Sequence, residues 1–309
     1  MSKVAIGMTQ SELPLISVVV PTYNYAHLLP RALDSVLTQT AEGVELIVVD
    51  DGSSDDTAEV LAEYSRQWPG LQVYRQANAG AASARNQGVR IARGRFVLLL
   101  DADDELAPGA LGVLCELVQS EPQIGMVLGA QISVYPDGRE RLRLPTPVPV
   151  ARPRKLARLY LLQKRISISH GSSLFRRDLL LRRPYPENLR SGEDIPVFAY
   201  LLVSAPVALI SQPLARIYKH TDSLRHSRIN EEEYALGMVR EVFIGLPGEC
   251  QTLLRRYTAQ RYLSLFRSAH GSKDRASARR FYLRALRLSP LQAMRWDYLR
   301  KALRLLLVS

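Results

Sequence analysis

Three carboxylates gather directly after one buried-type strand. Asp101, Asp103 and Asp104 follow the apolar run FVLLL at 96–100, which is too short to span a membrane and typical of a strand covered on both faces. Carboxylates this close together repel one another and resist burial unless a cation neutralises them. The sequence therefore predicts a divalent-metal site. The alternative is that Asp103 or Asp104 caps a helix that begins near Pro108.

Alternating strands and helices would position these side chains. We expect strands at 16–20, ended by Pro21, and at 45–49, 71–74 and 96–100, with helices between them. Such alternation implies right-handed crossovers and a parallel sheet. A polar cluster follows the carboxyl end of each strand: Thr22 to Asn24, Asp50 and Asp51, Asn78, and Asp101 to Asp103. Ligands of open α/β sheets bind at that edge, so we expect one composite site.

The motifs that the sequence lacks reduce the classes of ligand that this site could bind. The first strand is followed by Pro-Thr-Tyr-Asn rather than by the glycine-rich turn of a dinucleotide fold, and the chain has no P-loop motif. Without such a cradle a diphosphate needs a metal to neutralise it, and aspartates are suitable ligands. Tyr23 could stack on a base, and Asp51 could accept a base N–H. Tyr23 is equally well read as a rim residue, and Asp51 as a neighbour of a helix cap.

The second half of the chain contains further residues of catalytic types. Ser191 to Asp194 precede an apolar helical run at 196–203, and this pattern fits either acidic residues favoured by the helix dipole or a carboxylate base. His170 and His220 are single histidines, which are more often structural, although a neutral imidazole is a good Mn²⁺ ligand. The Pro- and Arg-rich stretch 139–158 fits a loop over the site or a plain connection.

Length and composition fit a protein of one large domain or one and a half. The chain has 309 residues, of which 47% are hydrophobic, and no run approaches the length of a membrane span. Its first residues lack the pattern of a signal peptide. The two cysteines, Cys115 and Cys250, have no metal or redox spacing, which fits a reducing compartment.

Positive charge is concentrated near the C-terminus. The formal net charge is +11, but residues 250–309 hold 14 of the 41 basic and 2 of the 30 acidic residues, which leaves 27 and 28 elsewhere. We expect helices at 276–289, closed by Pro290, and at 295–308, where Trp296 and several leucines recur beside arginines. These helices fit a hairpin packed on the catalytic domain, a basic amphipathic surface on anionic lipid, or both. Nucleic acid is the less favoured partner, since no recognition motif accompanies the charge.

Four segments together resemble a known family. VVVPTYN, VVDDGSSDDT, NAGAASARNQG and LLLDADD resemble, in order and spacing, the family-2 glycosyltransferases with a GT-A fold, and the resemblance covers about residues 15–225. By position it implies a nucleotide-binding set made of Pro21, Thr22, Tyr23, Asn24, Asp51, Asn78, Arg85, Asp101 and Ala102. Within this set Tyr23 would line the nucleobase pocket, Asp51 would bond the base, and Asp101 would lie near the ribose.

The same resemblance implies the catalytic and metal-binding residues. Asp103, the last residue of the DAD, would bind Mn²⁺ or Mg²⁺ that bridges the diphosphate, and His220 would reach back to the metal or the diphosphate. Asp194 would be the general base, with Glu193 orienting its neighbours. The segment HGSSLFR at 170–176 resembles the acceptor-side strand of the family.

We therefore expect an α/β protein with a mostly parallel sheet and a helical appendage. Its parts would be a lead-in (1–14), a catalytic domain (15–228, with nucleotide-binding half 15–104 and acceptor-binding half 105–228) and a basic helical region (229–309). The resemblance implies inverting transfer from a UDP- or dTDP-sugar to a glycan or lipid-linked glycan, for a bacterial lipopolysaccharide or other surface polysaccharide, at the cytoplasmic face of the inner membrane. The alternatives are a nucleotidyltransferase on a similar sheet and a non-catalytic nucleotide-sugar-binding protein.

Overall fold

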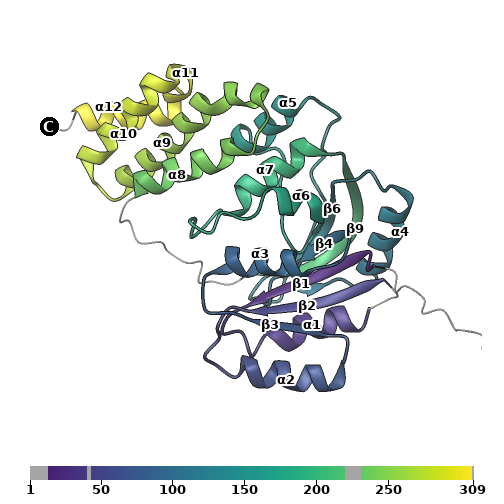
Figure 1. The fold of residues 1–309 in the computed structure, drawn as a ribbon. Coiled ribbons are helices and arrows are strands. Elements are labelled where there is room, and N and C mark those ends of the chain that lie inside the picture. Colours follow the sequence, from purple (N-terminus) through teal and green to yellow (C-terminus); the bar gives the residue numbers. More distant parts are fainter. Residues whose placement is uncertain (1–12, 40–42, 220–230, 308–309) are drawn as a thin grey trace, which may run out of the picture.

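A nine-stranded sheet with helices on both faces forms the main part of the protein, and a helical region stands at one end of it (Figure 1). The structure is a computed structural model that describes residues 13–39, 43–219 and 231–307. The strand order is β3-β2-β1-β4-β8-β6-β9-β5, with β7 paired to β6.

The first half has the predicted alternation of strands and helices. Its elements are β1 (Ile16–Thr22), α1 (Leu29–Leu37), β2 (Val44–Asp50), α2 (Thr57–Gln67), β3 (Gln72–Arg75), α3 (Ala81–Ile91) and β4 (Phe96–Leu99). The pairs β1–β2, β1–β4 and β2–β3 are all parallel, as expected. The prediction that Pro21 ends the first strand is wrong. The ladder between β1 and β4 stops at Val19, so Pro21 needs no N–H on that side and β1 continues to Thr22.

The second half turns the sheet into a mixed one. Its elements are β5 (Glu105–Leu106), α4 (Ala110–Ser120), β6 (Met126–Val134), β7 (Glu140–Arg143), α5 (Pro153–Ala157), the π-helix η1 (Arg158–Leu162), β8 (Ser173–Arg176), α6 (Arg177–Arg182), α7 (Asp194–Ser204) and β9 (Val207–Tyr218). Strand β8 runs antiparallel to both neighbours, β4 and β6. Antiparallel pairs also join β5 to β9 and β6 to β7, so the sheet is mixed rather than mostly parallel.

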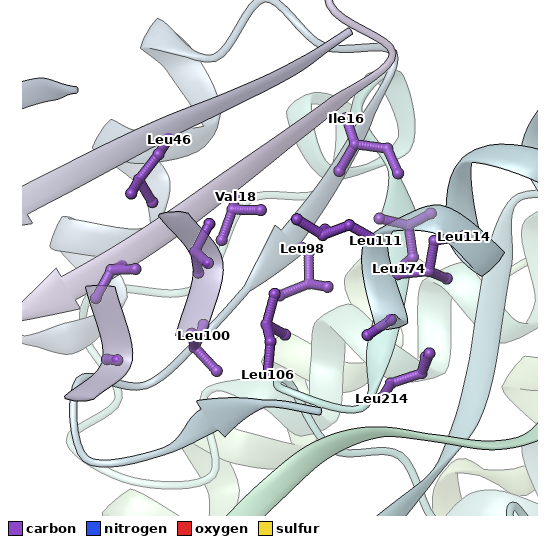
Figure 2. Packing of buried hydrophobic residues seen from close by; sticks show 14 of the residues in the cluster. Ile16, Val18, Leu46, Leu98, Leu100, Leu106, Leu111, Leu114, Leu174 and Leu214 are labelled. Carbon is purple, nitrogen blue, oxygen red and sulfur yellow. The ribbon is translucent and has the colours of Figure 1, made fainter. Parts of the chain in front are cut away.

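Two apolar layers hold the sheet between helices. Because side chains alternate along a strand, Val18 points into the layer covered by α1, α2 and α4, while Val19 points into the layer covered by α3, α6 and α7. Figure 2 shows the first layer, where Leu98 and Leu111 lie among the buried side chains. Helix α3 approaches β1 closely at Gly88, where a Cβ would stand 2.2 Å from Val19 Cγ1. This close approach brings the N-terminal half of α3 to the carboxyl edge of the sheet.

The C-terminal region is a set of helices that packs on α7. It comprises α8 (Glu231–Ile244), the 3-10 helix η2 (Gly248–Leu253), α9 (Leu254–Gly271), α10 (Arg275–Leu288), α11 (Pro290–Ala293) and α12 (Trp296–Leu307). One buried cluster unites Ala199 of α7 with Val242 of α8 and Tyr257 of α9. Helix α10 starts with a capped turn, in which Asp274 accepts the N–H of Ser277, and stops two residues before Pro290, as predicted. Among the described residues, no helix combines the length and the apolarity that a membrane crossing requires.

Candidate active site

Hydrogen bonds join the loops that follow β1 and β2 at the carboxyl edge of the sheet. The Asn24 N–H donates to Ser53 Oγ (2.9 Å), and Asn24 Oδ1 accepts the Ser54 N–H (2.8 Å). Asn24 adopts φ 56°, in the left-handed region that Asn tolerates better than most residues. Pro21 and Thr22 form the last residues of β1, and Tyr23 follows them with 44% of its surface exposed. The first two loops thus form one rigid rim with an accessible aromatic ring.

Asp51 connects this rim to the loop that contains Asn78. Its Oδ1 accepts Gln76 Nε2 (2.8 Å) and the Ala79 N–H (2.9 Å), and its Oδ2 accepts the Gly80 N–H (2.7 Å). The side chain is buried. Its carboxylate therefore organises the loop after β3, a role that sequence reasoning did not assign. Its contact with a base stays a prediction.

The acidic loop after β4 accumulates negative charge. Asp104 Oδ1 accepts the Tyr218 N–H (2.9 Å), and burial raises the pKa of Asp104 to about 8, with the charges of Asp101 and Asp103 adding to the shift. Ala102 is buried between the aspartates. The cap alternative is wrong, because α4 begins only at Ala110, after Gly109 at φ 77°. A left-handed glycine, and not a carboxylate, leads into that helix.

The donor set of this loop fits a hard divalent cation. Carboxylate oxygens are the ligands that Mg²⁺ and Mn²⁺ take in proteins, and a cation would offset the repulsion that raises the pKa of Asp104. Within the ranges that the structure describes, no three His, Cys, Asp or Glu side chains form a ready-made metal site. The predicted second ligand, His220, lies outside the described residues. Asp103 as a metal ligand stays a prediction.

An arginine and a tyrosine that sequence reasoning missed brace the acidic loop. The Arg31 guanidinium lies 3.6 Å from the centre of the Tyr218 ring, pairs with Glu105 Oε1 at 3.3 Å and donates to the backbone oxygen of Asp103. Tyr218 Oη donates to Glu105 Oε1 (2.9 Å). These contacts attach the end of β9 to the acidic loop.

Tyr25 is a second aromatic residue beside the acidic loop. Burial raises the pKa of its phenol, and the charges of Asp103, Asp101 and Asp104 raise it further. Its ring stacks on His27. The signal available in the sequence was a second tyrosine two positions after Tyr23.

Arg85 joins the acidic loop to the start of α7. One guanidinium nitrogen donates to Asp101 Oδ1 (3.0 Å), and the other donates to Glu193 Oε1 (2.7 Å). The exposed fraction of the side chain is 9% for Arg85, 16% for Glu193 and 37% for Asp101, so the pair with Glu193 is the better shielded from water. The resemblance implied a nucleotide contact for Arg85, which stays a prediction. What the structure gives this residue is a bridge between two carboxylates.

Asp194 is the first residue of α7 and has an elevated proton affinity. Burial raises the pKa of its carboxyl group, the neighbouring Glu193 raises it further, and Arg85 counteracts this. Glu193 occupies the N-cap position of α7 but makes no capping hydrogen bond with its side chain, since its carboxylate is turned to Arg85. The two acidic residues thus do more than complement a helix dipole.

His170 lies next to this network, and its contacts indicate a structural role. Its ring packs on Phe198, and its Nε2 is 3.1 Å from Tyr185 Oη. Burial, with the charge of Arg85, lowers the pKa of His170 to about 3. It is therefore neutral at ordinary pH, which agrees with the structural interpretation of a single histidine.

Comparison with known proteins places the chain in one family. The family model described as glycosyl transferase family 2 matches residues 17–182, which is more than half of the 309 residues. The uncharacterized glycosyltransferase YibD of Escherichia coli (strain K12) is 40% identical over 93 residues, 30% of this chain and 27% of that protein. A chondroitin synthase of Pasteurella multocida (strain Pm70) is 34% identical over 126 residues, 41% of this chain and 13% of that protein. These alignments span less than a third of either relative.

Solved structures agree on the fold. The crystal structure of S. aureus TarS superposes with a TM-score of 0.65 at 21% identity, over 90% of this chain and 82% of that one. The mannosyltransferase PcManGT from Pyrobaculum calidifontis superposes with a TM-score of 0.51 at 20% identity, over 96% and 85%. At such identities the likeness concerns the fold alone. The chain belongs to glycosyl transferase family 2 and has the GT-A fold.

Proposed function

We propose that this protein is an inverting, metal-dependent glycosyltransferase that moves a sugar from a UDP- or dTDP-sugar to an acceptor hydroxyl. The observation that carries the proposal is the bridge Asp101–Arg85–Glu193, which ends beside Asp194. It links a carboxylate at the end of β4, where a nucleotide sugar would bind, to a carboxylate of raised pKa that could act on an acceptor. Family membership supports the same reaction class.

The donor would lie along the carboxyl edge of β1, β2 and β4. Tyr23 would stack on the base, with Pro21 and Thr22 beside it, and Asp51 would accept a base N–H while it holds the loop at 76–80. Asn24, Asn78 and Arg85 would border the nucleotide, and Asp101 and Ala102 would lie by the ribose. The residues fit Mn²⁺ or Mg²⁺ at Asp103, and a cation there would offset the charge of the diphosphate.

Asp194 would act as the general base. Its carboxylate would take the proton of the acceptor hydroxyl while that oxygen forms a bond to the anomeric carbon. The bond from the anomeric carbon to the phosphate oxygen would break, and its electron pair would leave with the nucleoside diphosphate. Because attack comes from the face opposite the leaving group, the configuration would be inverted. Glu193, held by Arg85, would keep the Asp194 carboxylate in position to take the proton.

The acceptor would be a glycan or a lipid-linked glycan in the synthesis of lipopolysaccharide or another surface polysaccharide. Support comes from relatives named as chondroitin and hyaluronan synthases. Support for a nucleotide-sugar donor comes from TarS, solved with UDP-GlcNAc, and from PcManGT, solved with GDP-Man and Mn²⁺. We place the enzyme at the cytoplasmic face of the inner membrane, with 15–104 as the nucleotide-binding half, 105–228 as the acceptor-binding half and 229–309 as the membrane-proximal region.

Thermal-shift titration of the intact chain with UDP, dTDP and GDP, each with and without Mn²⁺, tests the donor assignment. We expect the uridine or deoxythymidine nucleotide to raise Tm in a Mn²⁺-dependent way. Release of nucleoside diphosphate from the matching sugar nucleotide then tests turnover. Release of pyrophosphate from a nucleoside triphosphate with a sugar phosphate would instead identify a nucleotidyltransferase. Binding without any release would identify a non-catalytic protein.

A further inference from the structure

Two residues of the apolar stripe that the sequence assigns to α12, Trp296 and Leu303, lie outside the packing face of that helix. The face turned into the bundle carries Ala302, which is buried. It also carries Tyr298 and Leu305, which are partly buried and pack against the same cluster. Trp296 has 67% of its surface exposed and Leu303 has 44%. Trp296 and Leu303 therefore face away from the bundle.

Neighbouring apolar residues extend this exposed face. In and just after α11, Leu291 is 83% exposed and Met294 is 57% exposed, and both lie shortly before Trp296 in the chain. We call Leu291, Met294, Trp296 and Leu303 the tip surface. Helices α11 and α12 lie at the end of the helical region that is farthest from the sheet (Figure 1). Nothing in the described part of the chain covers these four side chains.

Cations without acidic partners among the described residues flank the tip surface in the sequence. The basic residues nearest to it in sequence are Arg287, Arg295, Arg300, Lys301 and Arg304, and none of them forms an ion pair with a described residue. By contrast, Arg280 and Arg284 on α10 both pair with Glu232. Residues 275–309 hold nine basic residues and one acidic residue, Asp297. The unpaired charge thus collects at the same end as the exposed apolar groups.

We propose that the tip surface docks this protein on an anionic lipid bilayer, with Trp296 and the neighbouring apolar side chains in the interface and the arginines at the headgroups. Tryptophan suits this boundary because its ring is apolar at one end and polar at the other, and arginines reach headgroups with long side chains. Shallow insertion combined with attraction to anionic lipid is how basic amphipathic helices bind membranes. A second copy of the chain is a poorer occupant, since two surfaces of the same positive charge repel each other.

The docking itself rests on the tip surface, and only its purpose rests on the proposed function: it would bring the enzyme to a lipid-linked acceptor. Donor turnover without vesicles and vesicle binding without donor are separate measurements. A protein that binds vesicles but turns over no donor would retain the docking and lose the proposed reaction. A protein that turns over donor but does not bind vesicles would retain the proposed reaction and lose the docking.

The first experiment is co-sedimentation of the intact chain with vesicles of phosphatidylglycerol and phosphatidylcholine, against phosphatidylcholine alone. We expect binding only to the anionic vesicles, weakened by salt. Arg300→Glu with Arg304→Glu should lower the partition coefficient by about 100-fold or more, because each basic residue near an anionic surface is worth roughly a factor of five. The matched control is Arg66→Glu with Arg139→Glu, an equal charge change at exposed arginines of α2 and of the β6–β7 turn.

The second experiment uses the fact that the chain has two tryptophans, Trp68 and Trp296. In a Trp68→Phe variant, Trp296 is the single reporter, and its emission should shift to the blue and be quenched by brominated lipid. No binding of the intact chain to anionic vesicles at low salt would overturn the proposal. So would binding with unchanged Trp296 emission, an equal loss in the control variant, or a dimer in sedimentation velocity that Trp296→Ala abolishes.

Discussion

Replacing Glu193 and replacing Arg85 should shift the pH dependence of transfer in opposite directions. Glu193 raises the pKa of Asp194 and Arg85 lowers it. Among the described residues, the other ionisable side chains that interact with Asp194 are the phenols of Tyr160, Tyr185 and Tyr257, which are neutral at ordinary pH because burial raises the pKa of each. Asp194 works as a carboxylate, so activity rises with pH through its pKa. Glu193→Gln should therefore shift the acid limb of kcat/KM to lower pH, and Arg85→Gln should shift it to higher pH.

The hydrogen-bond geometry sets the accompanying loss of activity and stability. The 2.7 Å bond joins two ionised groups, and glutamine keeps an uncharged acceptor, so about 1 kcal/mol is lost, or roughly a factor of five in kcat. Arg85→Gln leaves two carboxylates without their cation, and we expect it to lower the free energy of unfolding by about 3 kcal/mol. Arg85→Lys keeps the charge but loses the two-pronged geometry, so kcat should fall while the acid limb stays in place.

The assay is a pH series of initial rates with saturating acceptor, accompanied by calorimetric titration of the nucleoside diphosphate. Circular dichroism checks that each variant is folded. Donor affinity should change little in Glu193→Gln, since Glu193 contacts Arg85 and not the nucleotide edge. If the acid limbs of Glu193→Gln and Arg85→Gln stay fixed or move together, Asp194 is not the group that titrates and the assignment of the base is wrong.

Three further changes test separate parts of the protein. Asp103→Ala should abolish nearly all transfer and make nucleoside diphosphate binding insensitive to Mn²⁺, as measured by calorimetry with and without the metal; full activity in chelator would refute the metal assignment. Asp194→Asn should lower kcat by about 10²–10⁴-fold with little change in donor affinity, and the reverse outcome would make Asp194 a structural residue. Gly88→Ala should destabilise the fold by about 1–3 kcal/mol in urea unfolding, because the added Cβ would stand 2.2 Å from Val19 Cγ1. Its control, Gly112→Ala in α4, meets no atom within 4 Å and should stabilise by about 0.5–1 kcal/mol; equal effects at the two sites would refute the close-packing argument.

Local patterns were sufficient for the first half of the fold. Each apolar run at 16–20, 45–49 and 96–100 is buried on both faces, and each is followed by a helix whose apolar face is visible in the sequence. In α1, for example, Leu29, Leu33 and Val36 recur at helical spacing and all are buried. Such information is contained within one element and its neighbours. The alternation also predicted the parallel pairing of these strands, whereas their order β3-β2-β1-β4 is known only from the structure.

The contacts that complete the candidate site join residues far apart in the chain, and periodicity does not encode them. Arg85 and Glu193 are 108 positions apart, and Asp104 and Tyr218 are 114 apart. The same holds for β8, which enters antiparallel between β4 and β6 although its sequence has no feature that distinguishes direction. The residue types were recognisable as chemical groups. Their partners became apparent only once the sheet had brought the two halves together.

The helical region shows why periodicity can identify an amphipathic helix and still misjudge which face is buried. Several buried residues of this bundle are small, namely Ala278 and Ala285 of α10, Ala293 of α11 and Ala302 of α12. Small side chains let helices approach closely, whereas Trp296 would hold two helices apart. A hydrophobic stripe judged by side-chain size selects the tryptophan and leucines instead. Because Ala302 packs on a cluster that Phe266 and Phe281 already fill, Trp296 and Leu303 are not needed to pack the bundle. They remain exposed near arginines that have no acidic partner among the described residues.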